Sequence, residues 1–347
     1  TLWFRKGTLI VREDYDTCDA IYWGDAYLVA EGMSRAGFVE IDTFSMAAGD
    51  NSDDVINAIN DGRTYVLYRG SGTGYWWYPF TIYPEDTDNG FKLPIVTAFT
   101  CYTIPEGGFN WLRVGTPDDP KGAVGYVGVT TLQYSGEGAR KRSALCRGFY
   151  RYVFWRTNAI RTLGEACEAG RRLLYHLFED DYEYCGLICV GDPELNLWTY
   201  TPMELVVEHP QAIVLEPTTV VVEVSRYVDL SPVANALVCL MMDTTVYEYG
   251  YTDADGVVSF YVEPQHVGDL HITVTGKNCL PYEGIISVIP AGAFIVCDTY
   301  EVVDTINGNR DGIINPGESI ALRVALKNIG VEVAESVYAF ICGYAEG

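Results

Sequence analysis

The chain lacks an excess of basic residues, and it also lacks any long apolar run. Its 347 residues contain 23 Lys and Arg against 47 Asp and Glu, a formal net charge of -24. A surface this acidic repels phosphates, which argues against a nucleic acid as partner, but it attracts divalent cations and suits a secreted or cell-surface protein. No stretch of about 18 apolar residues is present, so we expect no membrane span.

No signal peptide is visible, and the chain opens with strand-like residues, Thr1-Leu-Trp-Phe. We therefore expect a processed or trimmed fragment, for which a missing signal says little about export. The sequence also has no nucleotide-binding loop and no zinc-ligand spacing. Histidine is scarce, and none of the four falls at the end of a predicted central strand: His176, His209, His266 and His271.

Ten cysteines are too few for a disulfide scaffold at this length. Cys239 with Cys279, and Cys297 with Cys342, are candidate bridges if the compartment is oxidising. Each pair falls within one β-rich segment, but sequence does not fix the geometry that a disulfide needs. Cys185 and Cys189 lie four positions apart in an apolar stretch. If this stretch is a strand, both side chains lie on the same face of it. We interpret them as small buried hydrophobic side chains.

The first 203 residues alternate between short apolar runs and helical patterns, which predicts an α/β fold with a mostly parallel sheet and flanking helices. Strands are expected at Tyr65–Tyr68, Ile95–Phe99, Ala123–Val127 and Gly186–Val190, and helices from the N-cap Ser52, over Arg140–Trp155 and over Ile160–Phe178.

Helical periodicity stops near residue 203, and the sequence becomes rich in Val, Thr and Tyr. Residues 204–289 are predicted to form an all-β immunoglobulin-like sandwich. Residues 290–347 have about three strands, near 294–300, 319–327 and 331–342. We interpret this segment as an incomplete sandwich, because such a domain needs about seven strands and about 100 residues.

Two predicted strands lead into residues that are candidates for a functional site. The strand Tyr65–Tyr68 leads into the turn Gly70-Ser71-Gly72, and the segment Pro94-Ile-Val-Thr-Ala-Phe-Thr leads to Cys101. The carboxyl ends of parallel strands meet at one edge of a sheet, so we expect both residues at that edge.

The order and spacing of these pieces resemble the gingipain-like cysteine peptidases, whose catalytic domain has a caspase-like α/β fold. Further matching pieces are Lys121-Gly-Ala-Val-Gly-Tyr-Val-Gly-Val-Thr, Leu163-Gly-Glu-Ala and Gly191-Asp-Pro-Glu-Leu. The resemblance covers about residues 25–200, and an immunoglobulin-like domain usually follows in that family.

The resemblance implies that Cys101 occupies the position of the nucleophile and Ser71 that of the histidine between two glycines. Serine is neither basic nor charged, so the general base is missing. Arg69 is adjacent to this turn and cationic. It could depress the pKa of Cys101, but it cannot accept a proton at neutral pH. Cys101 is either a buried structural thiol or a reactive one, and Ser71 is either a natural loss or an inactivating change. Trp76 and Trp77 are candidates for a substrate pocket or for the core.

A twelve-residue stretch from Asn307 to Glu318 fits a calcium loop of the EF type. Its oxygen ligands would be Asn307, Asn309, Asp311, Asn315 and Glu318, with the carbonyl of Ile313 and a turn at Gly312. The alternative is a polar turn without an ion. Two charged stretches, 137–142 and 179–183, read as a solvated helix start and a solvated loop.

The missing base favours an extracellular structural protein that self-assembles and is built on a catalytically inactive peptidase fold. Its partners would be copies of itself, joined by strand donation into a filament, with residues 1–11 as a candidate donor. The alternative is a secreted cysteine endopeptidase with Cys101 as nucleophile, acting on a peptide through an unrecognised base or silenced at Ser71. A third hypothesis is a calcium-dependent adhesin.

Overall fold

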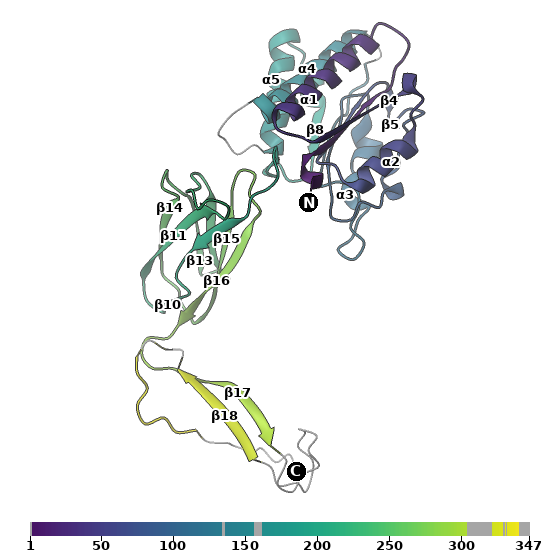
Figure 1. Cartoon of the computed structure of the whole chain (residues 1–347). Coiled ribbons are helices and arrows are strands. Elements are labelled where there is room, and N and C mark those ends of the chain that lie inside the picture. Colours follow the sequence, from purple (N-terminus) through teal and green to yellow (C-terminus); the bar gives the residue numbers. More distant parts are fainter. Residues whose placement is uncertain are drawn as a thin grey trace. The chain divides into compact units, whose positions relative to one another are not determined.

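The computed structural model describes residues 2–133, 136–155, 162–303, 321–328, 330 and 332–339. The chain divides into two compact units (Figure 1). The first unit runs to Met203 and includes Lys277–Cys279, and the second comprises Glu204–Gly276 and the residues from Leu280 onward. Within the described ranges, no helix is both long and apolar enough to cross a membrane.

A six-stranded sheet forms the centre of the first unit, in the order β2-β1-β3-β6-β7-β8. The first five strands of this order pair in parallel and β8 pairs antiparallel with β7. The strands are β1 (Lys6–Val11), β2 (Glu40–Ser45), β3 (Tyr65–Arg69), β6 (Ile95–Ala98), β7 (Gly125–Val129) and β8 (Leu187–Val190). The predicted α/β fold is therefore correct. The four predicted strands shift by one or two residues at their ends, whereas β1 and β2 were not predicted as members of the sheet. A short hairpin of β4 (Gly72–Thr73) and β5 (Tyr75–Trp76) follows β3.

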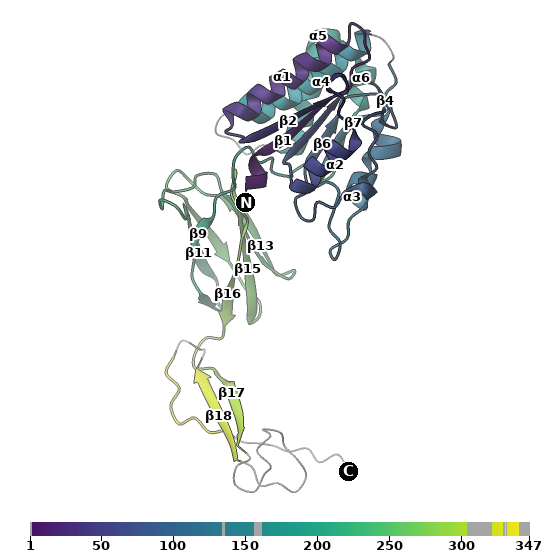
Figure 2. The ribbon, with the colours of Figure 1, turned by 45° about the vertical axis from the view of Figure 1, so that its right-hand side comes forward.

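Helices cover both faces of this sheet (Figure 2). One face carries α1 (Asp19–Arg35), α4 (Gly136–Trp155) and α5 (Leu163–Phe178), and the other carries α2 (Ser52–Asp61) and α3 (Asn110–Arg113). The short helix α6 (Asp181–Gly186) leads into β8. The described part of this unit also has short 3₁₀-helices at Leu2–Arg5, Met46–Ala48 and Pro84–Asp86, and a π-helix at Ile104–Gly108. Each face has its own apolar core, as expected for a sheet buried on both sides.

The strand β1 lies inside the sheet, paired with β2 on one side and β3 on the other. Five of its six residues are buried. The expectation that residues 1–11 act as a donor strand is therefore wrong, because these backbone groups are already paired within the unit.

Two local predictions are also corrected. The N-cap of α2 is Asn51 rather than Ser52: its side chain accepts from the Asp53 amide, and Asp54 completes a capping box. Cys185 lies in α6 and is exposed, whereas Cys189 lies in β8 and is half-buried. The two cysteines therefore do not share a strand face.

The second unit contains two sheets that enclose one apolar core. The five-stranded sheet has the order β10-β16-β15-β12-β13 and the three-stranded sheet the order β14-β11-β9. Their bounds are β9 (Leu205–Glu208), β10 (Ala212–Val214), β11 (Thr218–Arg226), β12 (Leu237–Met242), β13 (Val246–Tyr251), β14 (Val257–Val262), β15 (Gly268–Thr275) and β16 (Tyr282–Ile289). Cys239 is not part of a disulfide in this structure, and its candidate bridge to Cys279 in an oxidising compartment stays a prediction.

After residue 290 the described residues form one antiparallel pair, β17 (Ile295–Val303) and β18 (Ala321–Asn328). These match two of the three strands predicted there. Residues 332–339 form no strand, and the rest of the predicted third strand lies outside the described residues, with Cys342. The whole predicted calcium loop, 307–318, also lies outside them.

Candidate functional site

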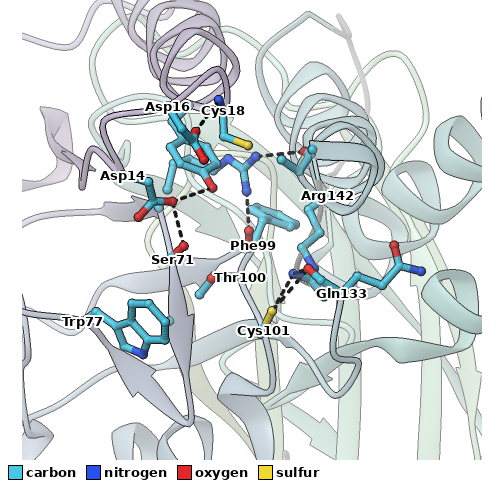
Figure 3. A pocket seen from close by; sticks show the side chains of 16 residues that line it. Asp14, Asp16, Cys18, Ser71, Trp77, Phe99, Thr100, Cys101, Gln133 and Arg142 are labelled. Atoms are coloured by element: carbon cyan, nitrogen blue, oxygen red, sulfur yellow. Dashed lines mark hydrogen bonds between the residues drawn. The ribbon is translucent and has the colours of Figure 1, made fainter.

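The turn after β3 and the residues after β6 meet at one cavity of about 120 Å³ (Figure 3). Ser71 and Cys101 both line it, as the parallel arrangement of their strands predicts. Sixteen residues form the lining: Asp14, Asp16, Cys18, Tyr22, Arg69, Gly70, Ser71, Gly72, Trp77, Phe99, Thr100, Cys101, Gln133, Gly136, Ala139 and Arg142.

Backbone contacts fix the turn at Ser71. The φ of Gly70 is +147°, and a Cβ there would lie 2.6 Å from the carbonyl oxygen of Arg12, so only glycine fits. The hydroxyl of Tyr68 donates to the carbonyl oxygen of Ser71 at 2.6 Å. The fully buried ring of Tyr68 is stacked on Trp76, with ring centroids 4.8 Å apart. These contacts hold the turn through Gly70 and the backbone of Ser71, and the side chain at position 71 takes no part in them.

The hydroxyl of Ser71 donates to Oδ2 of Asp14 at 2.6 Å. Asp14 follows β1, so a third strand end contributes to this edge of the sheet. The same carboxylate accepts from the hydroxyl of Tyr22 at 3.1 Å and pairs with Arg12. Burial raises the pKa of Tyr22, which keeps its hydroxyl a neutral donor. The serine is thus held by an acid and not directed at a thiol.

Cys101 is buried, with 6% of its surface exposed. Its Sγ donates to the carbonyl oxygen of Gln133 at 3.6 Å, and Nη1 of Arg142 donates to Sγ at 2.9 Å. No histidine lines this part of the described structure. The two carboxylates that do are Asp14, bonded as above, and Asp16, which accepts from the amide of Cys18 at 2.6 Å. The polar neighbours bonded to the sulfur are therefore a carbonyl and a guanidinium.

Arg142 reaches Cys101 from α4 and is itself held firmly. Its guanidinium donates to the carbonyl oxygens of Gln133 and Thr131, each at 3.2 Å, and to Oε1 of Glu183 at 3.2 Å. The side chains of Arg142 and Glu183 are only 5% and 0% exposed. Nε of Arg142 and Oε2 of Glu183 have no hydrogen-bond partner within the described ranges. The interpretation of 137–142 as a solvated helix start, and that of 179–183 as a solvated loop, are wrong at these two positions.

Arg69 also lines the cavity, but its charge is directed elsewhere. Its Nε lies 2.9 Å from Oδ2 of the fully buried Asp25, and its other nitrogens donate to the carbonyls of Phe99 and Ala139. Asp25 also pairs with Arg147, whose Nε lies 2.6 Å away. Arg69 therefore stabilises the packing of α1 on β3, and Arg142 is the cation at Cys101.

The sequence left open whether Trp76 and Trp77 lie in the core or in a substrate pocket, and the structure places Trp76 in the core and Trp77 at the cavity. Trp76 is 4% exposed and packs between Tyr68 and Trp111, so it belongs to the core. Trp77 is 42% exposed and lines the cavity under the guanidinium of Arg12. Of the two, only Trp77 lines the cavity.

Sequence reasoning missed Asp14, Arg142 and Glu183. Asp14 had a usable signal, because it follows the apolar run Thr8–Val11 just as Cys101 follows its own strand. Arg142 had none, since it lies 41 residues after Cys101 in a basic stretch of a helix. The described part of the chain holds no group of three or more His, Cys, Asp or Glu placed for a metal ion.

Comparisons with known proteins agree with this architecture. The sequence model of peptidase family C25 matches residues 17–198. The solved structure of the Arg-specific cysteine proteinase gingipain R is similar, with a TM-score of 0.69 and 19% identity over 82% of this chain and 67% of that chain. A complex of the pro- and mature domains of RgpB from Porphyromonas gingivalis gives a TM-score of 0.66 and 18% identity, over 82% of this chain and 69% of that one.

A third solved structure, of a protease, gives a TM-score of 0.67 and 17% identity, over 82% of this chain and 67% of that chain. No curated protein sequence matches the chain. At these identities the structural matches establish the fold alone. They confirm the gingipain-like α/β fold that the motifs predicted.

Proposed function

The chain belongs to peptidase family C25, and we propose that it is a member whose peptidase site is closed, so that the fold serves as an extracellular structural module. One observation carries the proposal. The sulfur of Cys101 is bonded to the Gln133 carbonyl and the Arg142 guanidinium. Ser71, which the resemblance puts at the position of the family's histidine, donates to Asp14.

A cysteine peptidase must remove the proton from its thiol before the sulfur attacks a carbonyl carbon. Neither polar neighbour bonded to Cys101 can accept that proton: an amide carbonyl is not basic enough, and a guanidinium stays protonated at neutral pH. Arg142 also occupies space beside the sulfur, where a base would have to stand. Loss of one member of a catalytic pair usually costs several orders of magnitude in rate.

A peptidase assay on the intact chain tests this proposal. We expect no turnover of fluorogenic peptides or of unfolded protein, and no labelling of Cys101 by a peptidyl ketone. The control is Cys101→Ala, which should be indistinguishable from the unaltered chain. Cleavage that an alkylating agent abolishes, and that Cys101→Ala lacks, would overturn the proposal.

The second candidate is a working cysteine endopeptidase with Cys101 as nucleophile, acting on peptide substrates. The observation that favours it is the cation at the sulfur, since reactive cysteines commonly have a Lys, Arg or His neighbour. Arg142→Ala separates the two: an enzyme that depends on Arg142 loses its activity, whereas a closed site becomes more reactive to alkylation. Ser71→His then asks whether restoring a base is enough for turnover.

The second unit supports a role outside the cell and in assembly. Its β9-β11-β14 sheet and its five-stranded partner enclose one core, as in an immunoglobulin-like sandwich. Among the described residues β17 and β18 pair only with each other, and we propose that a neighbouring copy adds a strand to this pair. The donor would have to be a segment other than β1. Sedimentation and electron microscopy with calcium should show polymers, and a strictly monomeric species at high concentration would contradict assembly.

We also propose that residues 307–318 bind calcium. The donor chemistry fits, since the side chains of Asn307, Asn309, Asp311, Asn315 and Glu318 all supply oxygen, which calcium prefers. The ion would stabilise the segment between β17 and β18. Calcium should raise the melting temperature of the second unit, and Glu318→Gln should abolish most of that rise. An equal rise in both proteins would contradict the site.

A further inference from the structure

A groove of about 410 Å³ runs along α4 and shares no lining residue with the cavity at Cys101. The helix α4 packs against both α1 and α5 (Figure 2). Five of the nine lining residues come from α4: Arg140, Ser143, Ala144, Arg147 and Arg151. Residues three, four, seven and eleven positions apart lie on one face of a helix, so this α4 groove follows a single side of α4.

The neighbouring helices give the α4 groove an apolar lining. Ile21 comes from α1, and Leu173, Leu177 and Phe178 come from α5. Leu177 is 57% exposed, and the other three side chains are half-buried. Apolar side chains gathered in a hollow and bordered by charges mark a surface for a partner, unlike single exposed leucines.

The arginines of the α4 groove retain positive charge in a very acidic chain. Arg140 and Arg151 are exposed, and neither forms a hydrogen bond or an ion pair with any residue that the structure describes. The acid one turn before Arg140 is Glu137, which pairs with Lys141 at 2.7 Å. Arg147 pairs with Asp25, but Asp25 is shared with Arg69, so these three residues together stay positive.

The length of this positive row shows what kind of ligand it fits. Arg140 and Arg151 are eleven positions apart, which is about 16 Å along a helix. A small molecule with one carboxylate would answer only one of the arginines, so the ligand needs several acids. The walls are helices, whose backbone groups are paired internally. An extended peptide would therefore lie on the apolar lining with its own backbone groups unpaired, whereas a helix pairs them itself.

We propose that the α4 groove binds an acidic amphipathic helix of a partner protein. The helix lies along α4, with its apolar side chains on Leu177 and Phe178 and its carboxylates toward the three arginines. Within the described ranges, α2 of this chain is acidic and amphipathic, but Val55 and Ile59 of its apolar face are already buried in the core. We therefore assign the helix to a different protein and not to a second copy.

Two synthetic peptides of about 18 residues, about 27 Å long as helices, test the inference on the intact chain by fluorescence anisotropy. Both carry the same leucine stripe, which is flanked by glutamates in one peptide and by glutamines in the other. The net charge of -24 repels the acidic peptide everywhere except at local cations. We nevertheless expect the glutamate peptide to bind about tenfold more tightly than the glutamine peptide.

Variants of the chain locate the binding. Arg140→Gln combined with Arg151→Gln should weaken binding of the glutamate peptide by about tenfold, because two exposed ion pairs are lost. Leu177→Ser should weaken it by a similar factor, because apolar contact is lost. The matched control is Arg172→Gln, which removes an exposed arginine of α5 that pairs with Glu168 and does not line the groove. That variant should bind as the unaltered chain does.

A second measurement maps the contact directly. The glutamate peptide should protect Arg140 and Arg151, but not Arg172, from an arginine-specific dicarbonyl reagent, as read by mass spectrometry. Absence of saturable binding, equal affinity for both peptides, or unchanged affinity of the double variant would overturn the inference. So would a chain that ignores the peptide but sediments with vesicles of phosphatidylcholine and phosphatidylglycerol through Arg140 and Arg151, because the groove would then serve a membrane surface.

Discussion

Replacing Glu183 by alanine should destabilise the first unit strongly, because it leaves the buried charge of Arg142 without its carboxylate. Both side chains are at most 5% exposed, and their charged atoms lie 3.2 Å apart. Removing one partner of such a buried pair typically costs about 3–5 kcal/mol in free energy of unfolding. The matched control is Glu31→Ala, which breaks an exposed pair with Arg35 whose side chains are 62% and 56% exposed. We expect that control to cost less than about 0.5 kcal/mol.

Urea unfolding followed by intrinsic tryptophan fluorescence is the assay. All seven tryptophans lie at or before residue 198, so the signal reports the first unit alone. With a slope of about 2 kcal/mol/M, Glu183→Ala should lower the urea midpoint by about 1.5–2.5 M.

A double-mutant cycle with Arg142→Ala then separates the pair from its surroundings. The double variant carries no unpaired charge, so it should be more stable than the sum of the two single effects predicts, by about 2 kcal/mol. Additive effects, or a Glu183→Ala cost no larger than that of Glu31→Ala, would refute the argument.

Two further predictions concern acid stability and the aromatic residues beside the turn. Hydrogen bonds from Lys6 and then Arg63 lower the pKa of Asp61 from 3.8 to about 2. The stability that this pairing contributes is therefore present above pH 3.8 and is lost as the pH falls toward 2. Between pH 3.8 and pH 2, the melting temperature of Asp61→Asn should therefore fall by less than that of the unaltered chain. A parallel loss in both proteins would contradict it. Trp76→Ala should cost about 3–5 kcal/mol in urea unfolding because Trp76 is 4% exposed, whereas Trp77→Ala should cost less than about 1 kcal/mol, and equal costs would mean that their assignment to core and cavity rim is wrong.

The mostly parallel α/β arrangement and the meeting of Ser71 with Cys101 were predictable because they depend on local patterns. Apolar runs mark buried strands, and parallel strands bring their carboxyl ends to one edge. The position of β1 was not predicted, since its pairing with strands 34 and 58 residues later is a long-range choice that its own residues do not encode. The capping of α2 shows the limit at single residues: Asn51 and Ser52 are both good caps, and Asp54 decides between them by completing the box.

The side chains around Cys101 could not be predicted from the sequence, for a different reason. Arg142 and Glu183 each lie in a stretch that looks solvated, because arginine and glutamate are seldom fully buried. They are buried only because they are buried together, each satisfying much of the other's charge. Such mutual dependence between distant residues has no signature in either stretch alone.

The turn at position 71 separates the demands of folding from those of chemistry. Its backbone is held by the close approach of Gly70 to Arg12 and by the hydroxyl of Tyr68, and none of these contacts involves the side chain in between. The side chain itself contributes the hydrogen bond to Asp14, so an exchange at position 71 would remove that one contact and leave the contacts of the turn's backbone in place.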